Sequence, residues 1–254
     1  MIPSETQGQQ LNDRKDTGPH NPPRPNSSAL AVRQILTVAA KDLRSELRSK
    51  EAINASLSFA LVILLLFSFA FEPTAEQTRE IAGGLLWLVF AFAGALILNR
   101  SFARELTNDC LDALIASPLS GPALFLGKAL ANFCLLMAIE MICIPVFGIF
   151  YNIRWYQQIW WLLLVLLLAT WGLTVIGTMF SALTVNLRLR ELMLPTLVYP
   201  VMIPGLMAAI QLTTPLVAGT PLSGDMFTWL RLLVAFDIIF TALAAALVET
   251  VLVN

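Results

Sequence analysis

The chain has 254 residues, of which 57% are hydrophobic and only 13% are charged. A soluble domain is nearer half apolar and a quarter charged, so this composition excludes an ordinary soluble globular protein and predicts an all-α polytopic membrane protein. The net charge of −1 excludes little, because in a membrane protein the distribution of Lys and Arg is more informative than their sum.

Residues 1–28 are polar, rich in Pro, Gly, Asn and Gln, and contain no apolar segment. They are therefore not a signal peptide, and they cannot bury enough surface to offset the entropy lost on ordering. We expect a disordered cytoplasmic tail, with the rest of the chain, residues 29–254, forming one membrane domain.

Residues 29–50 have the pattern of a basic amphipathic helix. One face of a helical wheel is apolar and the other is basic, formed respectively by Val32, Leu36, Ala39, Ala40, Leu43 and Leu47, and by Lys41, Arg44, Ser45 and Arg48. Such a helix directly before a membrane span is typical of an interfacial helix that lies among lipid headgroups. The alternative is a plain juxtamembrane connector.

Six apolar segments follow, each long enough to cross about 30 Å of hydrocarbon as a helix. Gly83, Gly84 and Gly94 in the second segment would allow close helix contacts. The predicted spans are residues 52–71, 81–98, 129–150, 159–183, 192–212 and 229–252.

The basic residues distinguish the two sides of the membrane. If the N-terminus is inside, the other side holds only Arg79, Arg154 and Arg231. The inner side then holds Arg14, Lys15, Arg24, Arg33, Lys41, Arg44, Arg48, Lys50, Arg100, Arg104, Lys128, Arg188 and Arg190. This asymmetry predicts that both termini and residues 99–128 are cytoplasmic.

Residues 99–128 are the longest polar interruption of the apolar sequence. Apolar residues recur there at helical spacing, at Phe102, Leu106, Leu111, Leu114 and Ile115. Ser117-Pro118 ends that helix, and a second helix begins near Ser120 and continues into the third span. The pattern predicts a cytoplasmic docking element on which a partner protein pushes; the alternative is a solvated connector.

The segment from Gly121 to Lys128 superficially resembles a phosphate-binding loop. Five residues rather than four separate its glycines, and Ala129 follows the lysine where Ser or Thr is required. We therefore expect no nucleotide site in this chain, and we interpret Lys128 as an interfacial anchor. If ATP drives the protein, the ATPase is another polypeptide.

Two ionisable residues fall inside predicted spans, Glu140 and Asp237. An ionisable residue in a membrane is costly, and it usually faces a cavity, a partner or a neighbouring subunit. The alternative for each is a neutral, hydrogen-bonded carboxyl that helps helices to pack. Both interpretations remain open from the sequence.

The fifth span contains Pro195, Pro200 and Pro204, which remove backbone donors and should bend or break the helix. No catalytic motif and no CxxC pair is present, so we expect no enzyme activity, resident cofactor or metal. The only histidine, His20, lies in the tail, so the spans lack the commonest protein ligand of haem.

Two segments resemble one family closely. Phe102–Phe133 (FARELTNDCLDALIASPLSGPALFLGKALANF) and Arg190–Ala209 (RELMLPTLVYPVMIPGLMAA) are similar to the corresponding segments of the haem exporter protein B family (CcmB). The resemblance covers about Ala31 to Val253. The amphipathic helix, six spans and charged segment between spans two and three also resemble the type-2 ABC exporter permease architecture.

The resemblance implies a permease subunit of the cytochrome c maturation ABC complex in the bacterial inner membrane, without an ATPase site of its own. It implies a cytoplasmic ATPase, membrane haem-handling subunits, a periplasmic haem chaperone and a second copy of the chain as partners, and no nucleic acid. Haem would be the substrate of the complex, either exported or released on its chaperone. The residues that would contact the ATPase are Arg104, Glu105, Asp109, Asp112, Ser117 and Pro118.

Two other functions remain open from the residues themselves. One is a general type-2 ABC permease for a lipid, glycan or drug. The other is an ATP-independent transporter or membrane scaffold. Paired broken helices in inverted repeats would favour a secondary transporter, and the sequence has one proline-rich span without a matching second.

Overall fold

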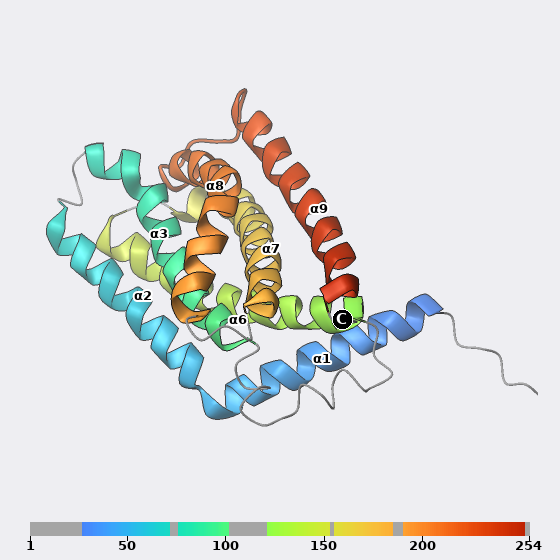
Figure 1. Cartoon of the computed structure of the whole chain (residues 1–254). Coiled ribbons are helices and arrows are strands. Elements are labelled where there is room, and N and C mark those ends of the chain that lie inside the picture. Colours follow the sequence, from blue (N-terminus) through green and yellow to red (C-terminus); the bar gives the residue numbers. More distant parts are fainter. Residues whose placement is uncertain (1–26, 72–75, 102–120, 153–154, 185–189, 252–254) are drawn as a thin grey trace, which may run out of the picture.

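The computed structural model describes residues 27–71, 76–101, 121–152, 155–184 and 190–251. Every regular element in these residues is a helix (Figure 1). The elements are α1 (Ser27–Ser49), α2 (Glu51–Ala70), α3 (Glu76–Arg100), α6 (Gly121–Phe150), the 3₁₀ helix η1 (Trp155–Gln158), α7 (Ile159–Leu183), α8 (Arg190–Val217) and α9 (Met226–Val251).

Six of the described helices, α2, α3, α6, α7, α8 and α9, are long and apolar enough to cross a membrane. The predicted all-α polytopic fold is therefore confirmed. Several helices extend beyond their predicted spans, including α3, which begins at Glu76 rather than at residue 81. α6 begins at Gly121, which confirms the prediction of a helix that starts near Ser120 and continues into the third span, and α8 continues to Val217.

Pro195, Pro200 and Pro204 do not break α8, which is one helix from Arg190 to Val217. The packing of α8 against α3, α7 and α9 supports the helix where backbone hydrogen bonds are missing. The Tyr199 hydroxyl adds a bond to the carbonyl of Ala91 on α3, at 3.0 Å. A break at these prolines was therefore the wrong expectation, and a bend stays a prediction.

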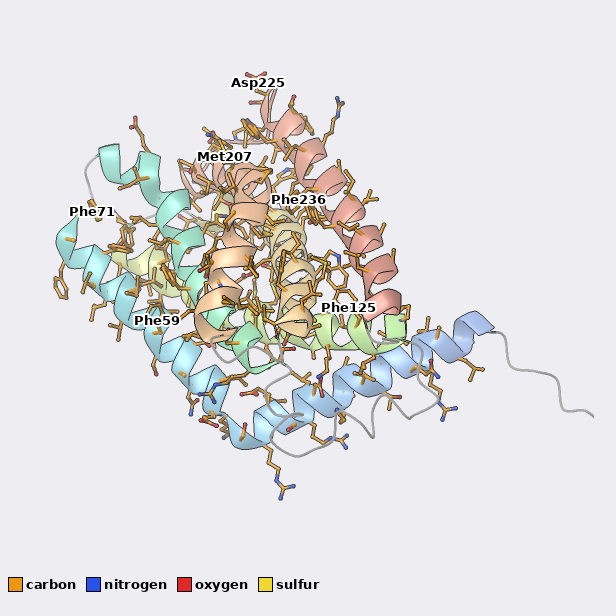
Figure 2. All side chains as sticks on the ribbon, viewed as in Figure 1. Phe59, Phe71, Phe125, Met207, Asp225 and Phe236 are labelled. Atoms are coloured by element: carbon orange, nitrogen blue, oxygen red, sulfur yellow. The ribbon has the colours of Figure 1, made fainter. Side chains whose placement is uncertain are left out.

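α3 is the most buried of the six helices, whereas α2 and α9 lie at opposite edges of the bundle (Figure 1). Trp87 of α3 is 1% exposed and its indole N–H donates to Thr213 Oγ1 of α8 at 2.9 Å. Figure 2 shows Phe236 of α9 turned toward the α7 and α8 pair, and Phe59 lies on α2, where its ring contacts Phe92 of α3. The core thus lies around α3, α6, α7 and α8.

α1 lies across one end of the bundle, which we call the α1 end (Figure 1). The chain turns from α1 into α2 at Lys50, whose φ of 55° is left-handed. Glu46, 5% exposed, accepts a hydrogen bond from the Ala52 backbone N–H at 2.9 Å. A carboxylate at a helix N-terminus satisfies a free donor and interacts favourably with the helix dipole, which stabilises this corner.

α1 covers the residues predicted to form an amphipathic helix, but its apolar face is divided. Ala39 is buried and Leu43 is half-buried, whereas Val32, Leu36 and Leu47 are each more than half exposed. The sequence pattern could not show which apolar side chains meet α6 and which remain outside. The location of α1 at a membrane interface stays a prediction.

Candidate functional site

The six predicted ATPase-coupling residues, Arg104, Glu105, Asp109, Asp112, Ser117 and Pro118, lie outside the described residues. Both flanks of their segment are described. Ser101 follows the last residue of α3, and Gly121 begins α6. The geometry at these two points shows how the segment is attached to the bundle.

Lys128, one of the buried residues near the start of α6, is 1% exposed. Its ammonium group lies 3.1 Å from Asp42 Oδ2 of α1 and donates to the Ser101 carbonyl oxygen, also at 3.1 Å. The interpretation of Lys128 as an interfacial anchor was therefore wrong. A lysine is buried this deeply when a carboxylate and a carbonyl satisfy it, and the sequence contained no sign of which acid would do so.

Asn132, one turn further along α6, is 5% exposed and extends the same network. Its side-chain amide donates to Ser101 Oγ and to Thr178 Oγ1 of α7, both at 2.9 Å. Lys128, Asp42, Ser101, Asn132 and Thr178 together are called the Lys128 cluster. They join α1, the end of α3, α6 and α7 at one place.

Two further contacts hold the end of α3. Ser181 Oγ of α7 donates to the Leu98 carbonyl at 2.9 Å. Arg100 lies 2.9 Å from Glu51 of α2, but side-chain exposures of 38% and 67% make this a weak ion pair. The buried contacts therefore fix the point where the chain leaves α3.

Gly127 lets α1 approach α6 closely. A Cβ atom at Gly127 would lie 2.6 Å from Val38 Cβ and 2.9 Å from the Ile35 carbonyl oxygen. Only a residue without a side chain fits between these atoms. The backbones of α1 and α6 therefore meet directly beside Lys128, so α1 packs as part of the bundle at the Lys128 cluster.

Glu140 is fully buried within α6. Thr170 Oγ1 of α7 lies 2.7 Å from Glu140 Oε1 and 2.8 Å from Oε2, so the hydroxyl donates to the carboxyl group. This arrangement is what the packing interpretation expects, because a buried carboxyl with a donor costs less than one without. A substrate-path role for Glu140 stays a prediction.

Asp237 of α9 is 6% exposed, and neither carboxyl oxygen has a hydrogen-bond partner among the described residues. The carboxyl group lies against Gly172 of α7, where an added Cβ would be 2.5 Å from Oδ1. Gly172 is two residues from Thr170, so carboxyl groups from α6 and α9 meet α7 at nearly the same level. No group of three or more potential metal ligands occurs within the described ranges.

Sequence reasoning missed Asp42, Ser101, Asn132, Thr170 and Thr178. No sequence motif marks these residues, because the partner of each one lies on another element of the fold. The one usable signal was the polar pair Lys128 and Asn132, one helical turn apart in an apolar stretch. That spacing indicates a polar stripe on one face of α6.

Comparison with known proteins shows the family to which the chain is related. The CcmB protein family model matches residues 33–252. The chain is 33% identical over 173 residues to heme exporter protein B of Rhodobacter capsulatus, covering 68% of this chain and 79% of that protein. It is 31% identical over 204 residues to heme exporter protein B of Paracoccus denitrificans, covering 80% and 91%. The homologous protein of Haemophilus influenzae is 28% identical over 193 residues, covering 76% and 86%. The chain belongs to the CcmB protein family.

Proposed function

We propose that this chain is the transmembrane permease subunit of an ABC complex for c-type cytochrome biogenesis. ATP is hydrolysed by a separate cytoplasmic subunit, and the chain lies in the bacterial inner membrane with both termini in the cytoplasm. Family membership and the names of the relatives, heme exporter protein B, support a role in haem export. Membrane haem-handling subunits, a periplasmic haem chaperone and a second copy of the chain complete the proposed complex.

The Lys128 cluster, which joins Ser101 to α6 at the flanks of residues 102–120, is the observation that carries this proposal. One end of the segment follows Ser101, whose carbonyl and hydroxyl are bonded to Lys128 and Asn132. The other end enters α6, which contains both of those residues. A displacement of the segment therefore reaches α3 and α6 together.

The same cluster distributes that displacement further. Asp42 transmits it to α1 and Thr178 to α7. Buried, mutually bonded polar groups resist independent movement, because separating them leaves unpaired groups away from water. Residues Arg104, Glu105, Asp109, Asp112, Ser117 and Pro118 are proposed as the contact on the ATPase.

Two versions of the transport step are compatible with this coupling. Haem could pass through the complex, or ATP hydrolysis could release the haem-loaded chaperone. The chain has a single histidine, His20, and none in its six spanning helices. Since histidine is the commonest protein ligand of haem, we favour release of the loaded chaperone.

Co-purification with the ATPase tests the proposal. The chain is expressed with the candidate ATPase subunit of its own organism, either unchanged or with Glu105→Lys and Asp109→Lys. We expect the unchanged chain to retain the ATPase and the charge-reversed chain to lose it. The matched control reverses two exposed acids, Glu80→Lys near the start of α3 and Asp225→Lys just before α9, and should retain the ATPase. Both helices start at the end of the bundle away from α1 (Figure 1).

The pathway is tested separately in cells. Deleting the gene should abolish haem-stained periplasmic c-type cytochromes, and the unchanged gene should restore them. Normal cytochrome bands in the deletion strain would contradict the pathway. If those bands were normal and the unchanged chain still co-purified with its ATPase, a type-2 ABC permease for a lipid, glycan or drug would be favoured instead.

A further inference from the structure

The two sides of α1 have different chemistry. Val38 and Ala39 are buried on the side that packs on α6, and the two acids of α1 belong to the same side. Asp42 bonds Lys128, and Glu46 caps α2. The acidic groups of the helix are therefore already engaged on the inner side.

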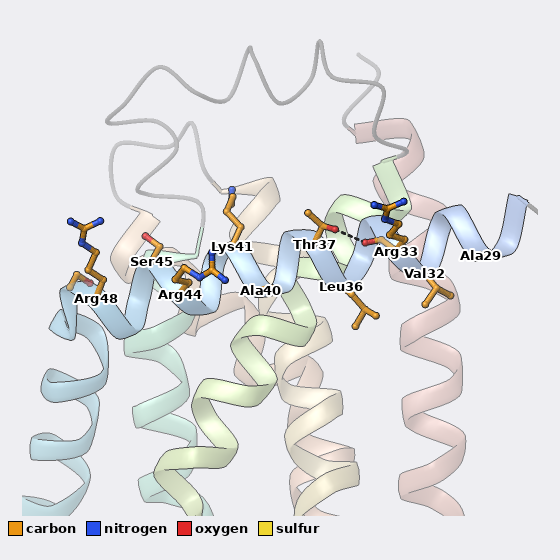
Figure 3. A pocket seen from close by; sticks show the side chains of 11 residues that line it. Ala29, Val32, Arg33, Leu36, Thr37, Ala40, Lys41, Arg44, Ser45 and Arg48 are labelled. Carbon is orange, nitrogen blue, oxygen red and sulfur yellow. Dashed lines mark hydrogen bonds between the residues drawn. The ribbon is translucent and has the colours of Figure 1, made fainter. Parts of the chain in front are cut away.

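The outer side is cationic and lines a groove (Figure 3). Arg33, Arg44 and Arg48 are exposed, and none forms an ion pair within the part of the chain that the structure describes. Lys41 adds a fourth positive charge, although it lies 3.1 Å from Asp42. Arg44 and Arg48 are one helical turn apart, so their positive charges follow one another along the helix.

Apolar side chains stand beside these cations. Val32, Leu36 and Leu47 are 54%, 55% and 54% exposed. Figure 3 shows Val32 and Leu36 pointing to the side along which the spanning helices run, whereas Lys41, Ser45 and Arg48 point the other way. The apolar side chains thus point toward the level of the acyl chains of a bilayer, and the polar and basic ones point away from it.

We propose that this outer side of α1 binds anionic phospholipid headgroups. The guanidinium groups of Arg33, Arg44 and Arg48 hydrogen-bond phosphate oxygens, for which the planar guanidinium is well suited. Val32, Leu36 and Leu47 enter the adjoining acyl layer, which removes them from water. The bound lipids hold α1 against α6 beside Lys128. The lipid composition therefore affects how firmly α1 is held at the Lys128 cluster.

Charge and orientation favour lipid over an acidic protein as the occupant. A protein partner would account for the cations but would leave Val32 and Leu36 directed toward the bilayer without a role. A lipid layer matches both groups of side chains at once, because its phosphates and acyl chains lie at the corresponding levels. Anionic lipid attraction should also weaken in salt.

Lipid titration of the purified full chain tests the proposal. The chain is prepared in an uncharged detergent, and its thermal unfolding is followed while phosphatidylglycerol or phosphatidylcholine is added. We expect phosphatidylglycerol to raise the midpoint more than phosphatidylcholine does, with the difference reduced at high salt. In the triple variant Arg33→Gln, Arg44→Gln, Arg48→Gln, the apparent affinity for phosphatidylglycerol should fall by about a hundred-fold, roughly five-fold for each basic residue.

A matched triple variant controls for the loss of positive charge. Arg79→Gln, Arg154→Gln, Arg231→Gln removes the three arginines predicted on the other side of the membrane, and it should keep the preference for phosphatidylglycerol. A second variant, Leu36→Ser with Leu47→Ser, should weaken the effect of both lipids equally. This pattern would separate the apolar contribution from the electrostatic one.

Three results would overturn the proposal. An unchanged response of the α1 triple variant would place anionic lipid elsewhere on the chain. Equal effects of the two lipids on the unchanged chain would leave an acidic protein as the better occupant. If inorganic phosphate alone reproduced the shift, the surface would recognise free phosphate rather than a membrane.

Discussion

The Lys128 cluster and the Asp237 site both bury ionisable side chains, but in opposite ways. The Lys128 ammonium meets a carboxylate, and Ser101 and Asn132 extend the bonding to four helices. The Asp237 carboxyl lies against a glycine with no hydrogen-bond partner among the described residues. A buried charge that bonds groups on several helices holds those helices together. A buried ionisable group without a bonding partner contributes only the cost of its desolvation.

The difference predicts opposite responses to mutation. Removing one member of the Lys128 cluster takes a bonding partner away from the buried side chains of that cluster. Removing the Asp237 carboxyl takes away a group that makes no bond in the described structure. Four sets of substitutions test this contrast, and their expected effects on stability decrease from the first set to the last.

Asp42→Ala should lower the free energy of unfolding by about 3 kcal/mol, because it leaves the buried Lys128 ammonium without its carboxylate. Lys128→Met should cost less, about 1 kcal/mol, since the Asp42 side chain is 22% exposed and water can solvate it. Denaturation in mild detergent measures both. The double variant Asp42→Ala, Lys128→Met should be more stable than Asp42→Ala alone. Equal losses of stability for the two single variants would contradict the expectation that Asp42→Ala costs more than Lys128→Met.

Gly127→Ala should cost about 2 kcal/mol, because the new methyl group would collide with Val38 and with the backbone at Ile35. The matched control is Gly84→Ala in α3, where an added Cβ would meet nothing within 4 Å. That variant should change stability by less than about 0.5 kcal/mol. Similar losses for the two glycines would show that α1 does not pack on α6 as described.

Thr170→Val should cost about 1 kcal/mol, because it removes the hydroxyl that donates to Glu140 while preserving the shape of the side chain. Thr196→Val is the control, since the Thr196 hydroxyl is exposed and bonds only its own helix, at the Leu192 carbonyl. It should be nearly neutral. If Thr170→Val were also neutral, the packing interpretation of Glu140 would lose its support.

Asp237→Asn should have the smallest effect, within about 0.5 kcal/mol of the unchanged chain or slightly stabilising, because no bond is lost. Thermal unfolding of the isolated chain and of the whole complex measures it. A loss of about 2 kcal/mol in the isolated chain would mean that the carboxyl does have a partner. A loss seen only in the complex would place that partner on another subunit.

The sequence predicted the parts of the fold that depend on long patterns. The six apolar segments could be recognised without knowledge of neighbouring helices. The orientation inferred from the basic residues stays a prediction. Boundaries were less accurate: the fifth span was predicted to end at residue 212, whereas α8 continues to Val217. The helix predicted to begin near Ser120 does begin there, at Gly121. The prolines of α8 were expected to bend or break the helix, and its neighbours keep it continuous.

The candidate site was harder to predict, because it depends on pairs of residues far apart in the chain. Lys128 and Asp42 are 86 positions apart, and nothing local distinguishes Asp42 from the other acids of the chain. Glu140 was recognised as an intramembrane carboxyl, but its donor Thr170 was not. The coupling residues from Arg104 to Pro118 stay predictions, since they lie outside the described residues.

The central claim is that the Lys128 cluster transmits the action of the ATPase to the membrane helices. It is tested most directly by haem staining of periplasmic c-type cytochromes in cells whose only copy of the gene has Lys128→Met. The variant chain must be present at normal abundance and must still co-purify with its ATPase. We predict that c-type cytochromes then fall by about ten-fold or more while the ATPase remains bound, as expected when a coupling of 1–3 kcal/mol is lost. Normal cytochrome levels under these conditions would contradict the claim.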